Sequence, residues 1–119
     1  QKMYIEAIEE FNNVIVKYPD NPIYTNAYKN ILFANIELKK WEKVIELSKI
    51  LLTLRDANLD GSVYYYMALA YENMNILDLA GKYYRILIDG NNFDPKYSGY
   101  ARKKIYNYLT IPELEIGNE

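Results

Sequence analysis

Residues 56–63 have the side chains and the spacing of a metal-binding loop. Glycine stands at the sixth position, Gly61, where such a loop must turn sharply. Oxygen-bearing side chains stand at the first, third and fifth positions: Asp56, Asn58 and Asp60. This is the first half of the pattern that holds Ca²⁺, a cation that takes about six to eight oxygen ligands. The twelfth position, which should supply a bidentate glutamate, is Met67.

The missing glutamate removes two oxygens and the side chain that would tie the loop to the following helix. A simpler interpretation is that Asp60 caps a helix and Gly61 accommodates a turn. We favour this structural interpretation and keep the calcium loop as the alternative. The sequence indicates no other metal site and no cofactor.

Catalytic side chains are scarce. The sequence contains neither cysteine nor histidine, so it lacks the commonest general base, the commonest metal ligand and all thiolate chemistry. The carboxylate pairs Glu6/Glu10 and Glu42/Glu46 stand four residues apart, a spacing that places both members on one face of a helix surface. No glycine-rich phosphate loop and no nucleophile motif occurs. We therefore expect a protein that is not an enzyme.

The composition is that of one folded domain, with 119 residues of which 50% are apolar and 25% charged. A net charge of −2 gives no electrostatic case for nucleic acid. No apolar run approaches the roughly 18 residues of a membrane helix, so we expect no membrane span. Because the chain opens at Gln1, we interpret it as a processed product and leave open a lipid anchor upstream.

Apolar side chains recur every three to four residues along six segments, which predicts six helices and no strand. Pro19 and Pro22 bracket the first turn. Gly90 is expected to end a helix in the left-handed conformation, and Asp94 with Pro95 to begin the last one. The predicted helices cover residues 3–18, 23–38, 41–54, 62–74, 77–89 and 95–109.

The chain repeats itself, because residues 4–11, 41–48 and 77–84 align without a gap. The offsets between the aligned segments are 37 and 36 residues. Self-similarity at such a period is typical of a solenoid of helical hairpins, in which no hairpin can bury its apolar face alone. The small or β-branched residues at the expected helix crossings are Ala7, Val44 and Ala80.

The repeat resembles the tetratricopeptide repeat (TPR) family, and residues 64–87 match its pattern best. The resemblance implies an all-α, TPR-type helical-hairpin solenoid of about six antiparallel helices in a right-handed array. Asn35 and Ser48 depart from the pattern at positions that are normally apolar. The residues that carry the match are Tyr64, Met67, Ala68, Ala70 and Tyr71 on the first helix and Leu77, Ala80, Tyr84 and Leu87 on the second.

The same resemblance implies a single domain over residues 1–109, followed by a flexible tail over 110–119. Within that domain we expect a half unit, two full units and a final helix: residues 3–19, 22–56, 61–92 and 95–109.

In TPR arrays the first helices of the hairpins line a concave groove that takes a helix or an extended peptide of another protein. The resemblance therefore implies a non-catalytic protein–protein interaction module, a scaffold or adaptor in a multiprotein assembly. The positions that would face the groove are Asn26, Lys29, Asn30, Phe33 and Glu37, then Ser62, Tyr65, Tyr66, Leu69 and Asn73, and finally Ser98, Arg102 and Ile105.

Several of these positions have a second interpretation. Tyr65 or Tyr66 could pack against a neighbouring helix, and Lys29 and Arg102 could be solvated charges. The 14 tyrosines of the chain are explained either by a binding surface or by A/T-rich codons. Self-association through the ends of the array is a further alternative, carried by Ile5, Ile8 and Tyr97.

Residues 11–22 are similar to the repeat ends of bacterial cell-envelope TPR proteins, including TPR lipoproteins of outer-membrane assembly. This similarity favours a periplasmic, outer-membrane-associated protein that acts in envelope biogenesis. A cytoplasmic location is the alternative.

Overall fold

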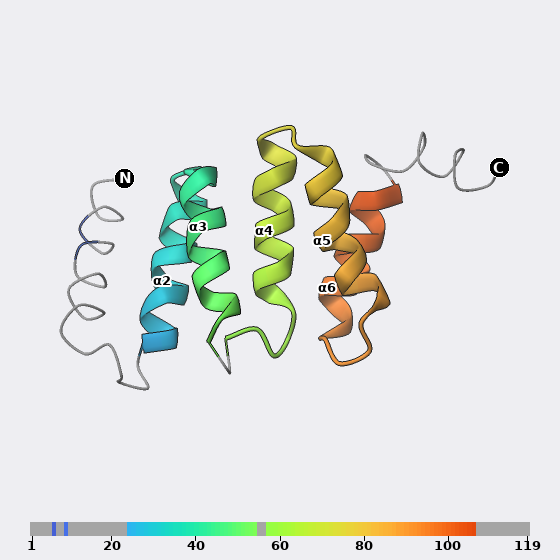
Figure 1. Cartoon of the computed structure of the whole chain (residues 1–119), viewed down its shortest axis with the longest axis horizontal. Coiled ribbons are helices and arrows are strands. Elements are labelled where there is room, and N and C mark those ends of the chain that lie inside the picture. The colour runs from blue at the N-terminus through green and yellow to red at the C-terminus, as the bar shows by residue number, and fades with distance from the viewer. Residues whose placement is uncertain (1–5, 7–8, 10–23, 55–56, 107–119) are drawn as a thin grey trace. The chain divides into compact units, whose positions relative to one another are not determined.

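The described part of the chain is built from helices. The computed structural model describes residues 6, 9, 24–54 and 57–106, and among these residues there is no strand. No helix in the described ranges is both long enough and apolar enough to cross a membrane. The all-α class predicted from the sequence is confirmed. The helices of the described ranges, labelled in Figure 1, are α2 (Tyr24–Glu37), α3 (Trp41–Leu52), α4 (Ser62–Asn73), α5 (Leu77–Asp89) and α6 (Pro95–Lys104).

The chain divides into two compact units, Gln1–Asn58 and Leu59–Glu119. In the first unit, α2 and α3 lie side by side and run in opposite directions (Figure 1). The 3.6-residue spacing of their apolar side chains turns one face of each helix towards the other. The side chains that are buried in this hairpin include Ala27, Ile31, Leu32, Val44 and Leu51.

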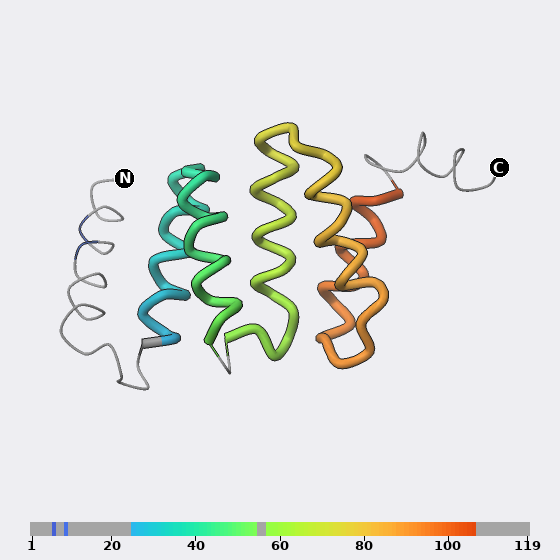
Figure 2. The backbone as a smooth tube through the Cα atoms, viewed as in Figure 1, coloured from blue at the N-terminus to red at the C-terminus, as the bar shows by residue number. Residues whose placement is uncertain are grey.

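The second unit consists of the antiparallel hairpin α4–α5 and of α6, which packs mainly on α5 (Figure 2). Ala68 and Ala80 are completely buried and let the helices approach closely, while the large ring of Tyr84 fills the space beside them. Tyr97 and Ala101 form the buried side of α6.

Both hairpins turn in the same way. Two residues after the end of each first helix stands a residue in the left-handed conformation, Lys39 with φ of 57° in one hairpin and Asn75 with φ of 62° in the other. The N–H of Lys40 then donates to the carbonyl of Asn35 at 2.9 Å. The bond 36 residues further on has the same length and joins Ile76 to Tyr71. The offset predicted from the sequence is thus repeated in the backbone of the two turns.

Helix bounds agree with the prediction to within two residues for α2 to α5, and α6 begins at Pro95 as predicted. The carboxylate of Asp94 accepts the N–H of Lys96 at 3.0 Å, which confirms the predicted cap. The left-handed conformation predicted for Gly90 is wrong, because its φ of −77° and ψ of 140° are extended. Of the helix predicted over 3–18, only Glu6 and Glu9 are described, and both are helical and exposed.

Gly61 and Gly90 are both needed for a close approach to Phe93. A Cβ on Gly90 would lie 2.5 Å from the Phe93 ring, and one on Gly61 would lie 2.7 Å from a methyl of Leu87. The backbone at Gly90 is extended and packs directly against the ring of Phe93. Asp94 then donates its N–H to the carbonyl of Asp60 at 3.0 Å, so the loop before α4 is tied to the loop before α6.

Candidate binding surface

The ring of Tyr65 on α4 is the centre of a cluster of tyrosines in the second unit. Its centroid lies 5.6 Å from that of Tyr66, 6.1 Å from Tyr84 of α5, and 5.7 Å and 5.6 Å from Tyr97 and Tyr100 of α6. Aromatic pairs attract at such separations beyond the apolar area that they bury. We call the four tyrosines of α4 and α6 in this cluster the tyrosine face: Tyr65, Tyr66, Tyr97 and Tyr100.

Exposure is graded across the tyrosine face. Tyr97 is buried, Tyr65 and Tyr66 are half-buried, and Tyr100 keeps 47% of its surface exposed. The rings of Tyr97 and Tyr100 meet edge to face at 6.1 Å. Rings held in place by other rings offer a large contact area without much side-chain freedom left to lose on binding.

The pKa values of three hydroxyl groups of this face, on Tyr65, Tyr66 and Tyr97, are raised, so these three groups are neutral over the physiological range of pH. Burial raises the pKa of Tyr66 to about 12, and the hydrogen bond that its hydroxyl donates to Tyr97 adds to the rise. Burial also raises the pKa of Tyr97, against the lowering effect of that same hydrogen bond. Burial raises the pKa of Tyr65 too, while the nearby Lys104 opposes it. These phenols can donate and accept hydrogen bonds, but they supply neither a base nor a nucleophile.

Glu72 joins the three helices of the second unit through polar contacts. Its Oε1 accepts the hydroxyl of the buried Tyr84 of α5 at 2.8 Å. Its Oε2 lies 3.3 Å from the Nζ of Lys104 of α6, an ion pair that is mostly shielded from solvent. This carboxylate therefore fixes the positions of α5 and α6 against α4.

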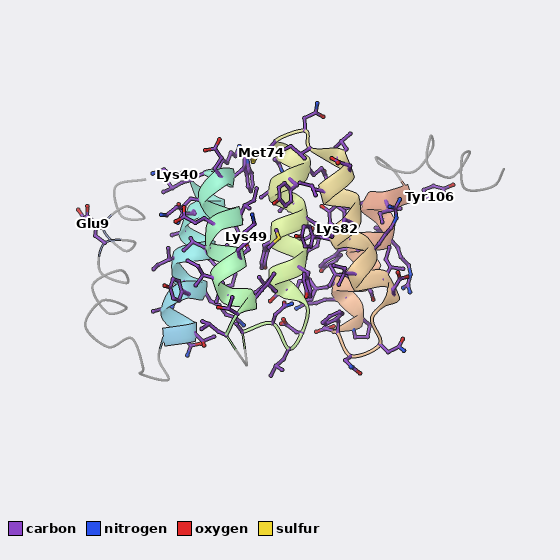
Figure 3. The ribbon with its side chains drawn as sticks, viewed as in Figure 1. Glu9, Lys40, Lys49, Met74, Lys82 and Tyr106 are labelled. Carbon is purple, nitrogen blue, oxygen red and sulfur yellow. The ribbon has the colours of Figure 1, made fainter. Side chains whose placement is uncertain are left out.

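A second row of rings runs along the other side of the α4–α5 pair. Tyr71 stacks on Tyr83 at 5.8 Å with 7° between the rings, and Tyr83 stacks on Tyr64 at 6.2 Å. Tyr64 then meets Phe93 edge to face at 5.8 Å. The ammonium of Lys82 lies 5.4 Å from the centroid of Tyr83 (Lys82 is labelled in Figure 3). This row holds the hairpin together and leaves the tyrosine face separate.

The groove residues predicted on α2 lie in the first unit. They share the side of the helix that faces away from its buried residues, and the large apolar one, Phe33, is 43% exposed. Lys29 is half-buried, and the others are exposed: Asn26, Asn30 and Glu37.

The groove residues predicted in the second unit form part of the tyrosine face and its surroundings. Tyr65 and Tyr66 are members of the face, and Leu69 on the same helix is half-buried. Asn73 is exposed and donates its side-chain N–H to the carbonyl of Leu69 at 2.8 Å, while Arg102 is exposed on α6. The alternative that a tyrosine packs on a neighbouring helix applies to Tyr65, whose ring meets those of α5 and α6.

Two positions differ from the prediction. Ser62 was expected to face the groove but is buried, with 6% of its surface exposed, because it begins α4 under the loop that Gly61 forms. Tyr97 was expected at an open end of the array but is also buried, since α4 and the rest of α6 cover its ring. Ser98 donates its hydroxyl to the carbonyl of Pro95, and Ile105 is half-buried. Ile5 and Ile8 lie outside the described residues.

In the loop before α4 the turn at Gly61 forms as expected, but the residue that caps the helix is Gly61 and not Asp60. Asp60 accepts the N–H of Ser62 at 2.9 Å through a carboxylate oxygen, and Gly61 has a φ of 87°, which favours glycine. Asp56 lies outside the described residues. Within the ranges that are described, no three Asp, Glu, His or Cys side chains gather closely enough to hold a metal ion.

The sequence analysis missed the part that α6 has in this surface. Tyr97, Tyr100, Ala101 and Lys104 follow the helical spacing of i, i+3, i+4 and i+7, which places them on one side of α6. That spacing was a usable signal, and it would have placed Tyr100 beside the tyrosines of α4.

Comparison with known proteins returned no match: no family model, no curated protein and no solved structure is similar to this chain.

Proposed function

We propose that this chain is a TPR-like helical repeat module that binds another protein and has no catalytic role of its own. In this proposal, α2–α3 and α4–α5 are successive units, and a helix over residues 3–18 begins a right-handed array of about six helices. The observation that carries the proposal is the tyrosine face, a prepared aromatic surface, and a hairpin turn that recurs at an interval of 36 residues supports it.

The recurrence extends from the turns to the buried side chains. Val44 and Ala80 stand at the same position of the second helix in the two hairpins, and Leu51 and Leu87 stand seven residues further on. All four are completely buried. A repeated backbone with repeated buried positions supports a solenoid, in which each unit contributes a similar strip of outer surface.

The chemistry of the tyrosine face suits an extended segment of a protein partner. The rings supply apolar contact area, and neutral hydroxyls close to them can bond to peptide N–H and C=O groups. Tyrosine is also enriched at protein interfaces for these reasons. The second unit contributes most of the aromatic surface, and α2 contributes Phe33 among polar side chains.

We propose a scaffold or adaptor role in a multiprotein assembly. The similarity to cell-envelope proteins rests on residues 11–22, which lie outside the described residues. Binding through the tyrosine face does not depend on the compartment.

The proposal can be tested by selecting peptides from a displayed library of random sequences on the full chain. Replacing the exposed Tyr100→Ala should weaken the selected peptides by roughly tenfold or more, as truncation of an aromatic anchor does. Tyr106→Ala is the matched control, because Tyr106 is 75% exposed and points away from the end of α6 (Figure 3). Circular dichroism would establish that each variant is folded. Unchanged binding of every selected peptide by a folded Tyr100→Ala variant would contradict the proposal.

A further inference from the structure

Gly99 stands in the interior of α6 with no structural reason inside the described chain. Among the residues that the structure describes, no atom lies within 4 Å of where a Cβ on Gly99 would be. Gly61 and Gly90, by contrast, lie under Leu87 and Phe93 so closely that no side chain fits. Glycine destabilises a helix interior relative to alanine, and one use of a glycine there is to let another backbone pack closely on it.

The helix face around Gly99 is basic. Lys96 stands three residues before Gly99, and Arg102 and Lys103 stand three and four residues after it, so that all four share one side of the helix. The three charged side chains are exposed. Residues 95–106 contain neither aspartate nor glutamate, although the chain as a whole has a net charge of −2. We call this side, made by Lys96, Gly99, Arg102 and Lys103, the basic face of α6.

Few contacts within the chain use these charges. Lys96 lies over the ring of Tyr97 at 5.1 Å, which still leaves its ammonium exposed. Within the described ranges, the side chains of Arg102 and Lys103 form neither a hydrogen bond nor an ion pair with the rest of the protein. Lys104, the next cation, is different, because it lies on the other side of α6 and pairs with Glu72.

We propose that the basic face of α6 is a docking site for an acidic amphipathic helix of a partner protein. Gly99 lets the partner's backbone approach to the short end of the usual interhelical distance, about 8 Å. Lys96 and Lys103 are separated by roughly 10 Å along the helix axis, about two turns. A partner helix with carboxylates seven residues apart, on either side of a small residue, would pair with both ends at once.

Two other polyanionic partners fit less well. A membrane surface would need apolar side chains that insert between lipids, and the basic face has Tyr100 at its edge but no aliphatic side chain. A nucleic acid would bind the cations through its phosphates. That contact is made at the ends of the long side chains and does not require a close approach to the backbone at Gly99. The proposed surface borders the tyrosine face at Tyr100, which stands four residues after Lys96, but the proposal does not rest on that face.

The test uses a displayed library of alanine-based helices of about 18 residues, long enough to be helical alone, with one face randomised. Selection on the full chain should enrich Asp or Glu at positions seven apart around Gly, Ala or Ser. Gly99→Leu should weaken the selected helices by roughly tenfold or more, because the leucine side chain blocks the close approach. The double reversal Arg102→Glu/Lys103→Glu should abolish binding of the acidic helices and favour their Lys-for-Glu counterparts.

The matched control is Lys82→Glu/Arg85→Glu, which reverses the same charge on the exposed side of α5 and should leave binding unchanged. Absence of acidic helices among the selected sequences would overturn the proposal. So would selected helices that are weakened by Tyr100→Ala and unaffected by Gly99→Leu, since they would occupy the tyrosine face.

The Gly99→Leu variant also identifies other occupants of the basic face. Leucine favours a helix over glycine, so this variant should be at least as stable as the wild type if the face is open. Lower stability of Gly99→Leu would mean that another segment of this chain already covers the face. A concentration-dependent dimer that is lost in Gly99→Leu would mean that a second copy does. Either result would contradict a partner helix. Binding of a single-stranded RNA or of anionic vesicles in place of acidic helices would contradict it as well.

Discussion

The hairpins α2–α3 and α4–α5 have the same turn but different cores. Asn35 and Ser48 of the first hairpin stand at the positions of Tyr71 and Tyr84 in the second, 36 residues on. All four residues are buried. The backbone that repeats is therefore compatible with either two large rings or two small polar side chains at equivalent positions.

The difference in volume is partly offset by a neighbouring position. Leu32, which is buried three residues before Asn35, is replaced by the smaller Ala68 before Tyr71. A core tolerates such exchanges when its total volume and its pattern of apolar positions are kept. The same turn geometry joins the two helices of each hairpin. The buried side chains between the helices differ in a coordinated way, with a smaller residue at one position where a larger one stands at its neighbour.

The hydroxyl of Tyr84 forms a hydrogen bond to a neighbouring helix. The buried polar side chains Asn35 and Ser48 of the first hairpin form no such bond between helices in the described part of the chain. Tyr84 reaches Glu72 of the neighbouring helix, whereas Asn35 donates to the carbonyl of Ile31 on its own helix at 2.8 Å. The hydroxyl of Ser48 is buried and has no hydrogen-bond partner in the described part of the chain. We therefore expect the polar groups of the second hairpin to stabilise it and Ser48 to destabilise the first.

The two hairpins can be followed separately in solution. Trp41 is the single tryptophan of the chain and begins α3, so its fluorescence reports on the first hairpin. Near-ultraviolet circular dichroism of tyrosine reports on the second unit, where the rings of Tyr65, Tyr84 and Tyr97 pack together. Urea unfolding measured by both signals shows whether a substitution acts on one hairpin or on both.

The largest effect is expected for Tyr84→Ala. Removing a fully buried ring leaves a cavity in the second unit, and such truncations lower the free energy of unfolding by about 3–5 kcal/mol. The loss should be seen in the tyrosine signal. Tyr84→Phe keeps the ring and removes only the hydrogen bond to Glu72, so it should lower the free energy by about 1–2 kcal/mol. Equal losses in the two variants would show that the polar contact, not the ring, is the main difference between the hairpins.

The sequence predicted the parts of the fold that depend on local pattern. Apolar spacing placed five helices, and the cap at Asp94 followed from a side chain and a proline next to each other. The backbone of Gly90 was predicted wrongly, because its extended conformation is imposed by Phe93, three residues away in the chain but in contact in space.

The candidate surface was predictable only in part, because some of its contacts join residues that are far apart in the sequence. The repeat placed Tyr65 and Tyr66 on α4, but the ring contacts that join them to α6 depend on how three helices pack. Glu72 contacts both Tyr84 and Lys104. Glu72 and Lys104 are 32 residues apart in the sequence, and no local spacing indicates that they pair. A glutamate on a helix surface and a glutamate between helices have the same sequence signature.

A smaller effect of opposite sign is expected in the first hairpin. Ser48→Ala removes a buried hydroxyl that has no partner in the described chain, so the free energy of unfolding should rise by about 1 kcal/mol. The gain should appear in the Trp41 signal. Thr53→Ala is a contrasting control on the turn after α3, because its hydroxyl donates to the carbonyl of Ile50 at 2.6 Å. Loss of stability in Ser48→Ala would show that the hydroxyl is hydrogen-bonded in solution.

The turns allow a finer comparison, because left-handed backbone is less favourable for lysine than for asparagine. Lys39→Gly should raise the free energy of unfolding by about 0.5–1 kcal/mol, since glycine adopts this conformation without strain. Asn75→Gly should give a smaller gain, although its φ of 62° is close to the 57° of Lys39. Thermal unfolding of both variants checks the order. A larger gain for Asn75→Gly would mean that the two turns are not equivalent in strain.

The last comparison is made at high pH, where Tyr66 of the tyrosine face titrates. The pKa of Tyr66 rises from 10.0 in the unfolded chain to about 12 in the fold, so the native state holds its proton more tightly. Its contribution to stability is therefore complete below pH 10 and is lost between pH 10 and about pH 12. In Tyr66→Phe this part of the loss should be absent, which urea unfolding across that range would measure as a shallower decline than in the wild type. Identical declines would show that Tyr66 is as solvated in the fold as in the unfolded chain. The other charged groups are the same in both proteins, so the difference between the two curves isolates the phenol.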